Sequence, residues 1–254
     1  MQFGKLTLKA CRYGWMLFSG PYIGKCFDLY GQYSESEVAM MRTFLKPGST
    51  VVDVGANIGD LTVPLARAVG ETGRVYAIES HPTVFNVLCA NLALNGLENV
   101  KPINAFVAAS DDIETGSKHW GKFAYVSQKW APQFMSLDGL DLEACDLIKV
   151  DVDGKELEVL RSGEMQVEKH RPILYLENDI RDASADLLSF VIDTLGYKAY
   201  WHPAPIFDER NFFGNPVNHW PQSIVSLMVL AVPAERKLNV EGLKPINHKN
   251  DWWD

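Results

Sequence analysis

The stretch Val51-Val-Asp-Val-Gly-Ala-Asn-Ile-Gly-Asp60 decides the fold. It opens with an apolar run typical of a buried strand, and Gly55 and Gly59 then allow the chain to turn into a helix. A strand that passes through a glycine turn into a helix begins a βαβ unit. We expect the N–H groups at the start of that helix to face a bound ligand.

Strands and helices alternate on both sides of this stretch. A first helix is predicted from Ser34, where Ser34 and Glu37 form a capping box. With the strand of this stretch included, five apolar runs are predicted as strands at Thr50–Val54, Arg74–Ile78, Val100–Val107, Asp146–Val150 and Pro172–Leu176. The helices between and after them are predicted at Asp60–Val69, Thr83–Leu94, Lys155–Arg161 and Ala183–Leu195. Residues 108–145 show no convincing helical period.

The last two predicted strands distinguish a sheet that ends with a reversed strand from one that repeats βαβ units to its end. Tyr197–Trp201 and Ser223–Val232 are predicted strands without a helix between them, so they must pair antiparallel. The sequence therefore predicts an α/β, Rossmann-like fold of the class I methyltransferase type. Its sheet would be mostly parallel and seven-stranded, with an antiparallel last strand and helices on both faces.

The chain is predicted to consist of three segments. Residues 1–33 are rich in glycine and aromatic residues and are predicted to be an irregular strap over the main domain. Residues 34–236 form that domain, and residues 237–254 form a tail. Trp252 and Trp253 could dock the tail on its own domain or on a second subunit, so a homodimer is left open.

Composition indicates an acidic enzyme of ordinary globular type. The 254 residues carry a formal net charge of −8, and 47% of them are hydrophobic. This charge argues against nucleic-acid binding, which usually needs a basic surface. Four dispersed cysteines indicate free thiols, buried at Cys89 and Cys145, and a reducing compartment. Without a long apolar span or a convincing signal sequence, the predicted location is cytoplasmic and no membrane span is expected.

Acidic side chains around the glycine turn indicate which ligand binds there. Asp53 could accept hydrogen bonds from the ammonium of a methionine moiety, directly or through water, and Glu79 could accept from two ribose hydroxyls. Asn57 occupies the middle of a G-x-N-x-G turn, where a side chain would obstruct a pyrophosphate. S-adenosylmethionine has no phosphate, so it is the predicted cofactor. A purely structural turn without a ligand is the competing interpretation.

Three segments of the chain together resemble the FkbM family of methyltransferases. They are Val51–Asp60, Ile78-Glu-Ser-His-Pro82 and Asp146-Leu-Ile-Lys-Val-Asp-Val-Asp-Gly-Lys-Glu156, and the similarity runs from about Gly31 to Val232. The resemblance implies a class I fold, S-adenosylmethionine as cofactor, and methyl transfer usually to oxygen and sometimes to an amide nitrogen. The chain departs from the family pattern at Asp153, where glutamate is more common.

The resemblance also implies cofactor contacts outside the glycine turn. Asn104 and Ala105 would border the adenine, and Tyr33 and Glu37 would approach the methionine end. The complete predicted cofactor site consists of Tyr33, Glu37, Asp53, Gly55, Asn57, Gly59, Glu79, Ser80, Asn104 and Ala105.

The catalytic residues are expected at the carboxyl ends of the strands, where open α/β sheets bind ligands. Methyl transfer depends on holding both reactants in line, and a hydroxyl acceptor also gains from a nearby base. We predict Asp151 first and Glu177 second for this role, followed by Asp153.

Structural roles compete with these assignments. Asp153 and Glu156 could form a capping box, Asp151 could bond only to backbone, and Glu177-Asn-Asp179 could be a solvated loop. A divalent metal held by Asp151, Glu177 and Asn178 is a further alternative. The prediction is that no metal is bound.

The connection His202–Gln222 is long and carries several aromatic residues. Loops of this length inside a compact domain are usually functional or disordered, and this one is too apolar for disorder. We predict that it is a substrate-facing lid, with aromatic packing over the sheet edge as the alternative.

The predicted function is S-adenosylmethionine-dependent methyl transfer to oxygen, with transfer to nitrogen left open. The acceptor could be a small molecule, a glycan, a lipid or a peptide. An NAD-dependent oxidoreductase and a non-catalytic cofactor-binding module are the alternatives.

Overall fold

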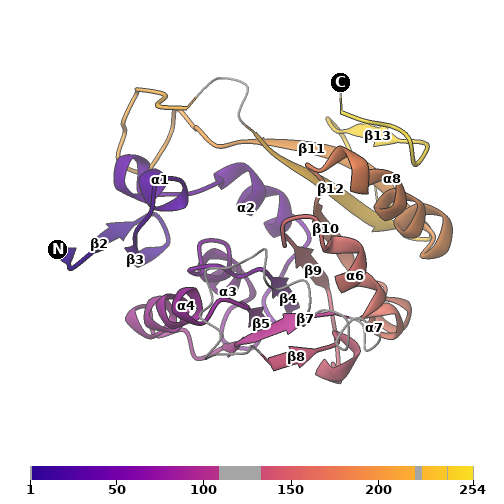
Figure 1. The fold of residues 1–254 in the computed structure, drawn as a ribbon, viewed down its shortest axis with the longest axis horizontal. Helices are drawn as coiled ribbons and strands as arrows, with labels where there is room; N and C mark the ends of the chain where they lie inside the picture. Colours follow the sequence, from indigo (N-terminus) through magenta and orange to yellow (C-terminus); the bar gives the residue numbers. More distant parts are fainter. Residues whose placement is uncertain (1, 109–132, 221–224, 239, 254) are drawn as a thin grey trace.

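The computed structural model describes residues 2–108, 133–220, 225–238 and 240–253. One eight-stranded sheet organises these residues, with the strand order β13-β11-β12-β10-β9-β4-β5-β6 (Figure 1). The strands are β4 (Thr50–Val54), β5 (Arg74–Ile78), β6 (Val100–Ile103), β9 (Leu147–Val150), β10 (Ile173–Glu177), β11 (Tyr197–Pro205), β12 (Val225–Pro233) and β13 (Lys244–Ile246).

The predicted fold class is confirmed. The adjacent strands β10, β9, β4, β5 and β6 are parallel to one another, whereas β12 runs antiparallel to both β10 and β11. The expected number of seven strands is wrong, because the tail adds β13 antiparallel to β11. Trp252 packs on Trp201 with ring centroids 5.6 Å apart, so the tail docks on its own domain.

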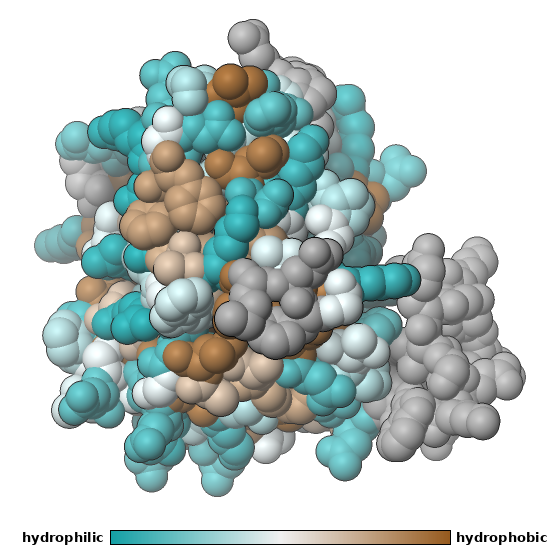
Figure 2. Space-filling model, turned by 90° about the vertical axis from the view of Figure 1, so that its left-hand side faces the viewer, coloured by the Kyte–Doolittle hydropathy of each residue, from teal (hydrophilic) through white to brown (hydrophobic). Residues whose placement is uncertain are grey.

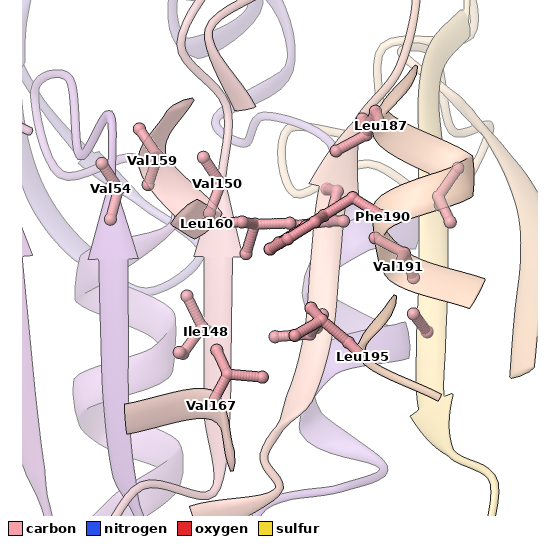
Figure 3. Close-up of a cluster of buried hydrophobic side chains, with 14 of the residues drawn as sticks. Val54, Ile148, Val150, Val159, Leu160, Val167, Leu187, Phe190, Val191 and Leu195 are labelled. Atoms are coloured by element: carbon pink, nitrogen blue, oxygen red, sulfur yellow. The ribbon is translucent and has the colours of Figure 1, made fainter. Parts of the chain in front are cut away.

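Helices cover both faces of the sheet. One face carries α2 (Glu35–Arg42), α3 (Thr62–Val69) and α4 (Pro82–Leu94), and the other carries α6 (Glu156–Arg161), α7 (Glu164–His170) and α8 (Arg181–Ser189), which continues as a π-turn over Phe190–Thr194. Successive strand residues point to opposite faces, so Val51 and Leu147 pack under α2 and α3, while Ile148 and Val150 pack under α6 and α7. Figure 3 shows the hydrophobic cluster under α6, α7 and α8, in which Leu160 and Phe190 point toward each other over β9 and β10.

The predicted third strand is interrupted at Asn104. The side-chain amide of Asn104 donates to the carbonyls of Glu79 and Ser80, at 2.8 and 3.2 Å, and the main sheet ends at Ile103. The following residues form β7 (Ala105–Val107), which pairs instead with β8 (Gln133–Met135). The predicted strand Val100–Val107 is therefore two strands. Most of the unpatterned segment 108–145 lies outside the described residues.

Both predicted capping boxes are wrong. Ser34 and Asp153 have positive φ angles of 40° and 52°, so neither has the extended backbone of an N-cap residue. The Ser34 hydroxyl donates to the Glu37 carboxylate at 2.5 Å. Glu156 accepts from the N–H groups of Val152 and Gly154, so its carboxylate closes the turn before α6.

The N-terminal segment is regular, which corrects the predicted irregular strap. Strands β1 (Gln2–Phe3), β2 (Leu6–Cys11) and β3 (Gly14–Phe18) form an antiparallel sheet, and α1 (Ile23–Tyr30) follows it. Phe18 stacks on Phe27 of α1 with ring centroids 5.7 Å apart. The backbone of β3 bonds to Asn91 of α4 and to Asn95, the residue that caps this helix, which fixes this unit on the main domain.

The state of the cysteines and the search for a membrane-spanning helix can be compared with what the composition predicted. The four cysteines are free thiols; Cys145 is buried as expected, whereas Cys89 is only partly buried. Among the described residues, no helix is long and apolar enough to cross a membrane.

Candidate active site

A buried row of polar side chains crosses the centre of the parallel sheet. Asp53 of β4, Lys149 of β9 and Tyr175 of β10 stand directly opposite one another, on the face covered by α2 and α3. The ammonium of Lys149 lies 3.2 Å from Oδ1 of Asp53 and donates to the carbonyl of Gly55 at 2.9 Å. Thr62 donates to the other Asp53 oxygen at 2.6 Å. Asp53 is 0% exposed, so the structure does not fit direct contact with a ligand ammonium.

Lys149 is the main feature of this site that the sequence analysis missed. Burial lowers its pKa, but Asp53, Asp151, Asp60 and Glu37 together raise it above the ordinary lysine value. Lys149 is therefore charged and holds several carboxylates in one place. A lysine inside the apolar run Leu147–Val150 was the available signal, because a charge buried in a strand needs a partner.

Asp151 and Glu177 lie together one step further along the strands, at their carboxyl ends. Oδ2 of Asp151 is 3.5 Å from the Lys149 ammonium, and the Asp151 side chain is 37% exposed. Burial, followed by the negative charge of Asp151, raises the pKa of Glu177 to about 10. At neutral pH Glu177 is consequently protonated, next to the Asp151 carboxyl. The structure brings the first two predicted catalytic residues together, whereas Asp153 is exposed on the following turn.

Two more acids border this pair, Glu37 from α2 and Asp60 from the end of the glycine turn. Burial raises the pKa of Glu37 to about 7 and that of Asp60 to about 8. Oε2 of Glu37, Oδ1 of Asp60 and Oε2 of Glu177 are buried without a hydrogen-bond partner among the described residues. Burial, with the charges of Glu37, Asp60 and Asp151, raises the pKa of Tyr33, which places this phenol among the acids. Asp60, at the end of the glycine turn, was not predicted as a site residue.

The N–H groups of the glycine turn are used within the protein. Those of Gly55 and Ala56 donate to Ile78, that of Gly59 donates to Ala56, and that of Ile58 donates to the side chain of Asn57. The expectation that the N–H groups at the start of α3 face a ligand stays a prediction, because it does not concern Gly55–Gly59. A phosphate-containing ligand would find these donors occupied, which agrees with the argument against a dinucleotide.

Glu79 connects the glycine turn to the end of β5. One carboxylate oxygen accepts from the N–H of Asn57 at 3.0 Å, and the other accepts from the N–H of His81 at 2.7 Å. Each carboxylate oxygen can accept a second hydrogen bond, so both stay suited to ribose hydroxyls. Asn104 bonds to the backbone of Glu79 and Ser80, and Ala105 is only 3% exposed.

Aromatic residues lie beside the acidic cluster. The Tyr22 ring is 6.1 Å from that of Tyr33 and 5.1 Å from that of Trp220, with near-perpendicular planes in both pairs. The described part of the predicted lid rests on α1: Phe213 N–H donates to Tyr30 O, and His219 N–H donates to the Tyr30 hydroxyl. The aromatic loop thus packs on the N-terminal unit rather than on the sheet edge.

Helix α2, which carries Glu37, is fixed to the sheet by a buried histidine. His202 Nε2 lies 3.1 Å from the Ser36 hydroxyl, and His202 Nδ1 lies 2.7 Å from the Tyr175 hydroxyl. Asn178 donates to Ser184 at 2.9 Å, so its side-chain amide is engaged by α8. Among the described residues, no group of three or more His, Cys, Asp or Glu side chains could hold a metal ion.

The fold and family comparison define an S-adenosylmethionine-dependent, Rossmann-like methyltransferase. Residues 53–200, more than half of the chain, match the methyltransferase FkbM domain. The chain belongs to the FkbM methyltransferase family. The alternatives of an NAD-dependent oxidoreductase and of a non-catalytic module are set aside by this finding.

Solved structures at low sequence identity share the fold. The precorrin-6y C5,15-methyltransferase of Geobacter metallireducens is 16% identical with a TM-score of 0.52, covering 78% of this chain and 86% of that one. A Thermotoga maritima S-adenosylmethionine-dependent O-methyltransferase is 17% identical with a TM-score of 0.51, covering 92% and 79%. An FkbM methyltransferase of Methylobacillus flagellatus is 17% identical with a TM-score of 0.50, covering 74% and 44%.

Curated relatives match over shorter segments. The tRNA(Phe) (4-demethylwyosine(37)-C(7)) aminocarboxypropyltransferase of Methanocaldococcus jannaschii is 38% identical over 86 residues, 34% of this chain and 33% of that protein. The catalytic subunit of the tRNA (adenine(58)-N(1))-methyltransferase of Yarrowia lipolytica is 32% identical over 82 residues, 32% of this chain and 21% of that protein. The chain thus spans a third or less of the length of these relatives.

Proposed function

We propose that this methyltransferase acts on a hydroxyl group at the carboxyl ends of β9 and β10, with Asp151 as the base. The observation that carries the proposal is the partly exposed Asp151 side chain, whose Oδ2 lies 3.5 Å from the Lys149 ammonium and which has the protonated Glu177 beside it. A partly exposed carboxylate can reach an acceptor hydroxyl and accept its proton.

The residues present fit S-adenosylmethionine. Its ammonium and sulfonium are cationic, and the buried oxygens of Glu37 and Asp60 have no partner among the described residues. We assign these two carboxylates to the methionine end, together with the Tyr33 phenol. Glu79 is assigned to the ribose hydroxyls, with Ser80, Asn104 and Ala105 next to the adenine. Asp53 acts indirectly, through Lys149 or a water molecule.

The glycine turn contributes through its shape. A Cβ at Gly55 would lie 1.9 Å from the carbonyl oxygen of Asp151, so only glycine lets the turn approach the end of β9. This approach is what brings the turn and Asp151 into one site. Gly59 and Asn57 complete the turn against which the cofactor is proposed to rest.

The protein's contribution to the reaction is positioning and proton acceptance. The bound cofactor supplies an electrophilic methyl group on a sulfonium. Asp151 accepts the proton of the acceptor hydroxyl as the methyl–oxygen bond forms and the methyl–sulfur bond breaks, leaving an ether and S-adenosylhomocysteine. Lys149 holds the Asp151 side chain in position, with its ammonium 3.5 Å from Oδ2. Asp153 is not assigned a role in this step, because it is exposed on the turn beyond the pair.

The proposed acceptors are those that an acidic site beside aromatic residues can bind. We propose a small molecule, a glycan, a lipid or a peptide, methylated on oxygen in preference to nitrogen. The two tRNA-modifying relatives raise the possibility of a nucleic-acid acceptor, but the net charge of −8 opposes phosphate binding. A cytoplasmic location is retained as a prediction from the free thiols.

Two measurements test the proposal. Calorimetric titration of the full chain should show binding of S-adenosylmethionine and none of NAD. Mass spectrometry of hydroxyl and amine acceptor panels should then show a mass gain of one methyl group on hydroxyl compounds, together with S-adenosylhomocysteine. Asp151→Asn should retain cofactor binding and lose product formation. Equal product yield from Asp151→Asn and wild type would refute the assignment of the base.

A further inference from the structure

His202 contacts two parts of the candidate active site at once. Its Nε2 lies 3.1 Å from the hydroxyl of Ser36, the residue before Glu37 in α2. Its Nδ1 lies 2.7 Å from the hydroxyl of Tyr175, which stands opposite Lys149 in the buried polar row. The ring therefore connects the helix that carries Glu37 to the strands that carry the polar row.

The side chain of His202 reaches across β12 to make these contacts. Strand β12 lies between β11 and β10, and His202 pairs with Met228 of β12. Met228 and Tyr175 belong to one hydrophobic cluster, on the face covered by α2 and α3. His202 is 6% exposed, so both ring nitrogens are removed from water and need partners within the protein.

An uncharged imidazole satisfies both partners. Burial lowers the pKa of His202, so the ring is neutral at neutral pH. One ring nitrogen of a neutral histidine donates a hydrogen bond and the other accepts one, and a hydroxyl group can do either. Ser36 and Tyr175 can therefore both bond to the neutral ring, and the ring needs no counter-ion.

The first turn of α2 determines where the Glu37 carboxylate lies. Glu37 is 2% exposed, and its Oε1 accepts from the Ser34 hydroxyl at 2.5 Å. The carboxylate has little freedom of its own, so its position follows that of the turn. A group that binds a ligand must be held to within about 0.5 Å by the contacts behind it, and Ser36 supplies such a contact.

A second set of contacts attaches the same turn to the N-terminal unit. The Tyr13 hydroxyl donates to Glu35 at 2.5 Å, and Arg12 lies 3.6 Å from the other Glu35 oxygen. Figure 2 looks onto the end of the molecule formed by this unit, where hydrophobic side chains lie among hydrophilic ones. The side chains of Arg12 and Glu35 are 30% and 19% exposed. Because water competes less for buried bonds, we expect the His202 contacts to fix the turn more strongly.

From this geometry we infer that His202 is a positioning residue for the cofactor. Through Ser36 it holds the turn that presents Glu37 to the methionine end of S-adenosylmethionine. The inference rests on the proposed function, which assigns Glu37 to that end. His202 needs no contact with the cofactor itself. Loss of its Nε2 bond should weaken cofactor binding, whereas loss of its Nδ1 bond alone should have little effect.

Two substitutions distinguish the two bonds of the ring. The glutamine amide can take the place of Nε2, so His202→Gln keeps the bond to Ser36 and loses the bond to Tyr175. The asparagine amide can take the place of Nδ1, so His202→Asn keeps the bond to Tyr175 and loses the bond to Ser36. In calorimetric titrations of the full chain with S-adenosylmethionine, His202→Gln should stay within about twofold of the wild-type Kd. His202→Asn should raise the Kd by about tenfold.

Ser36→Ala removes the same bond from the helix side and leaves the sheet unchanged. It should raise the Kd as much as His202→Asn does, and the double variant Ser36→Ala/His202→Asn should be no weaker than either single variant. Thr43→Val is the matched control, because it removes a hydroxyl bond at the other end of α2, and it should bind like wild type. Thermal unfolding establishes which variants are folded, and Ser36→Ala carries the test if a His202 variant is not.

Glu37→Gln distinguishes failure of this inference from failure of the proposed function. If Glu37→Gln binds S-adenosylmethionine like wild type, the assignment of Glu37 is wrong and the role of His202 falls with it. If Glu37→Gln weakens binding but Ser36→Ala does not, the proposed function stands and the inference about His202 is overturned. Equal affinities of His202→Gln and His202→Asn would also overturn it, because a role in stability alone does not depend on which of the two bonds is lost.

Discussion

The ammonium of Lys149 lies 3.2 Å from Oδ1 of Asp53, and both side chains are almost completely buried. The two residues stand opposite each other in adjacent parallel strands, at the level just below the carboxyl ends. This ion pair connects the glycine turn, through the carbonyl of Gly55, to Asp151 at the end of β9. The geometry of the proposed site therefore depends on a charge pair inside the sheet.

Removal of the Lys149 charge should strongly destabilise the protein. Lys149→Met leaves Asp53 buried without its cation, which typically costs about 3–5 kcal/mol. Denaturant unfolding should show this loss, and the double variant Lys149→Met/Asp53→Asn should recover part of it. Lys198→Met, at an exposed position of β11, provides the comparison and should be close to wild type. Equal stability of Lys149→Met and Lys198→Met would contradict the ion-pair argument.

Asp151 and Glu177 should respond very differently to neutral substitutions. Asp151→Asn removes the proposed base and should lower the turnover rate by about 10²- to 10⁴-fold. Glu177→Gln replaces a carboxyl that is already protonated at neutral pH, because burial and Asp151 raise its pKa to about 10, so its effect should be far smaller. The rates are measured with an accepted hydroxyl compound. A larger loss from Glu177→Gln would reverse the two roles.

Asp153→Asn distinguishes the third predicted catalytic residue from the other two. Asp153 is exposed on the turn after β9 and has a left-handed backbone conformation, with φ of 52°. The substitution should leave turnover near the wild-type value, since asparagine tolerates this conformation as well as aspartate does. A loss comparable to that of Asp151→Asn would restore Asp153 to the catalytic set.

The buried acids should make the protein less stable as the pH rises. Burial raises the pKa of Asp60 from 3.8 to about 8, so between these values the folded state keeps a proton that the unfolded state releases. The free energy of unfolding then falls with increasing pH across this window, by at most about 1.4 kcal/mol per pH unit for one group. Glu37 acts in the same direction up to about pH 7.

Asp60→Asn should flatten that decline, because asparagine does not titrate. The measurement is a series of denaturant unfolding curves from about pH 4 to about pH 8. Glu71→Gln, an exposed position after α3, is the matched control and should keep the wild-type slope. An unchanged slope in Asp60→Asn would show that Asp60 is ionised in the folded protein throughout this range.

Substitutions at Gly55 and Gly70 distinguish the cost of backbone strain from the cost of a steric clash. Both have positive φ angles, of 79° and 66°, but a Cβ at Gly55 would meet the carbonyl of Asp151, whereas a Cβ at Gly70 would meet nothing within 4 Å. Gly70→Ala should therefore cost about 1–2 kcal/mol of conformational strain. Gly55→Ala should cost more and should also weaken S-adenosylmethionine binding in a calorimetric titration. Similar costs for the two variants would rule out the close approach.

The local sequence pattern was enough to predict a sheet covered by helices on both faces. The strands β4 and β5 begin and end where the apolar runs and glycines predicted, because a strand buried on both faces is apolar throughout. The reversed β12 followed from the missing crossover helix, and Asp151 and Glu177 followed from the rule that parallel strands end at one edge.

Contacts between distant segments decided the rest. Lys149 becomes part of the site only because Asp53, almost a hundred residues earlier, is its register partner. Asn104 ends β6 because its amide reaches the backbone of Glu79 and Ser80, and no local propensity encodes that bond. The glycine stretch Val51–Asp60 determined by itself that a strand turns into a helix there. Which of its N–H groups stay available, and which acid stands beside it, depended on long-range pairing, since hydrogen-bond partners are fixed only when the sheet is assembled.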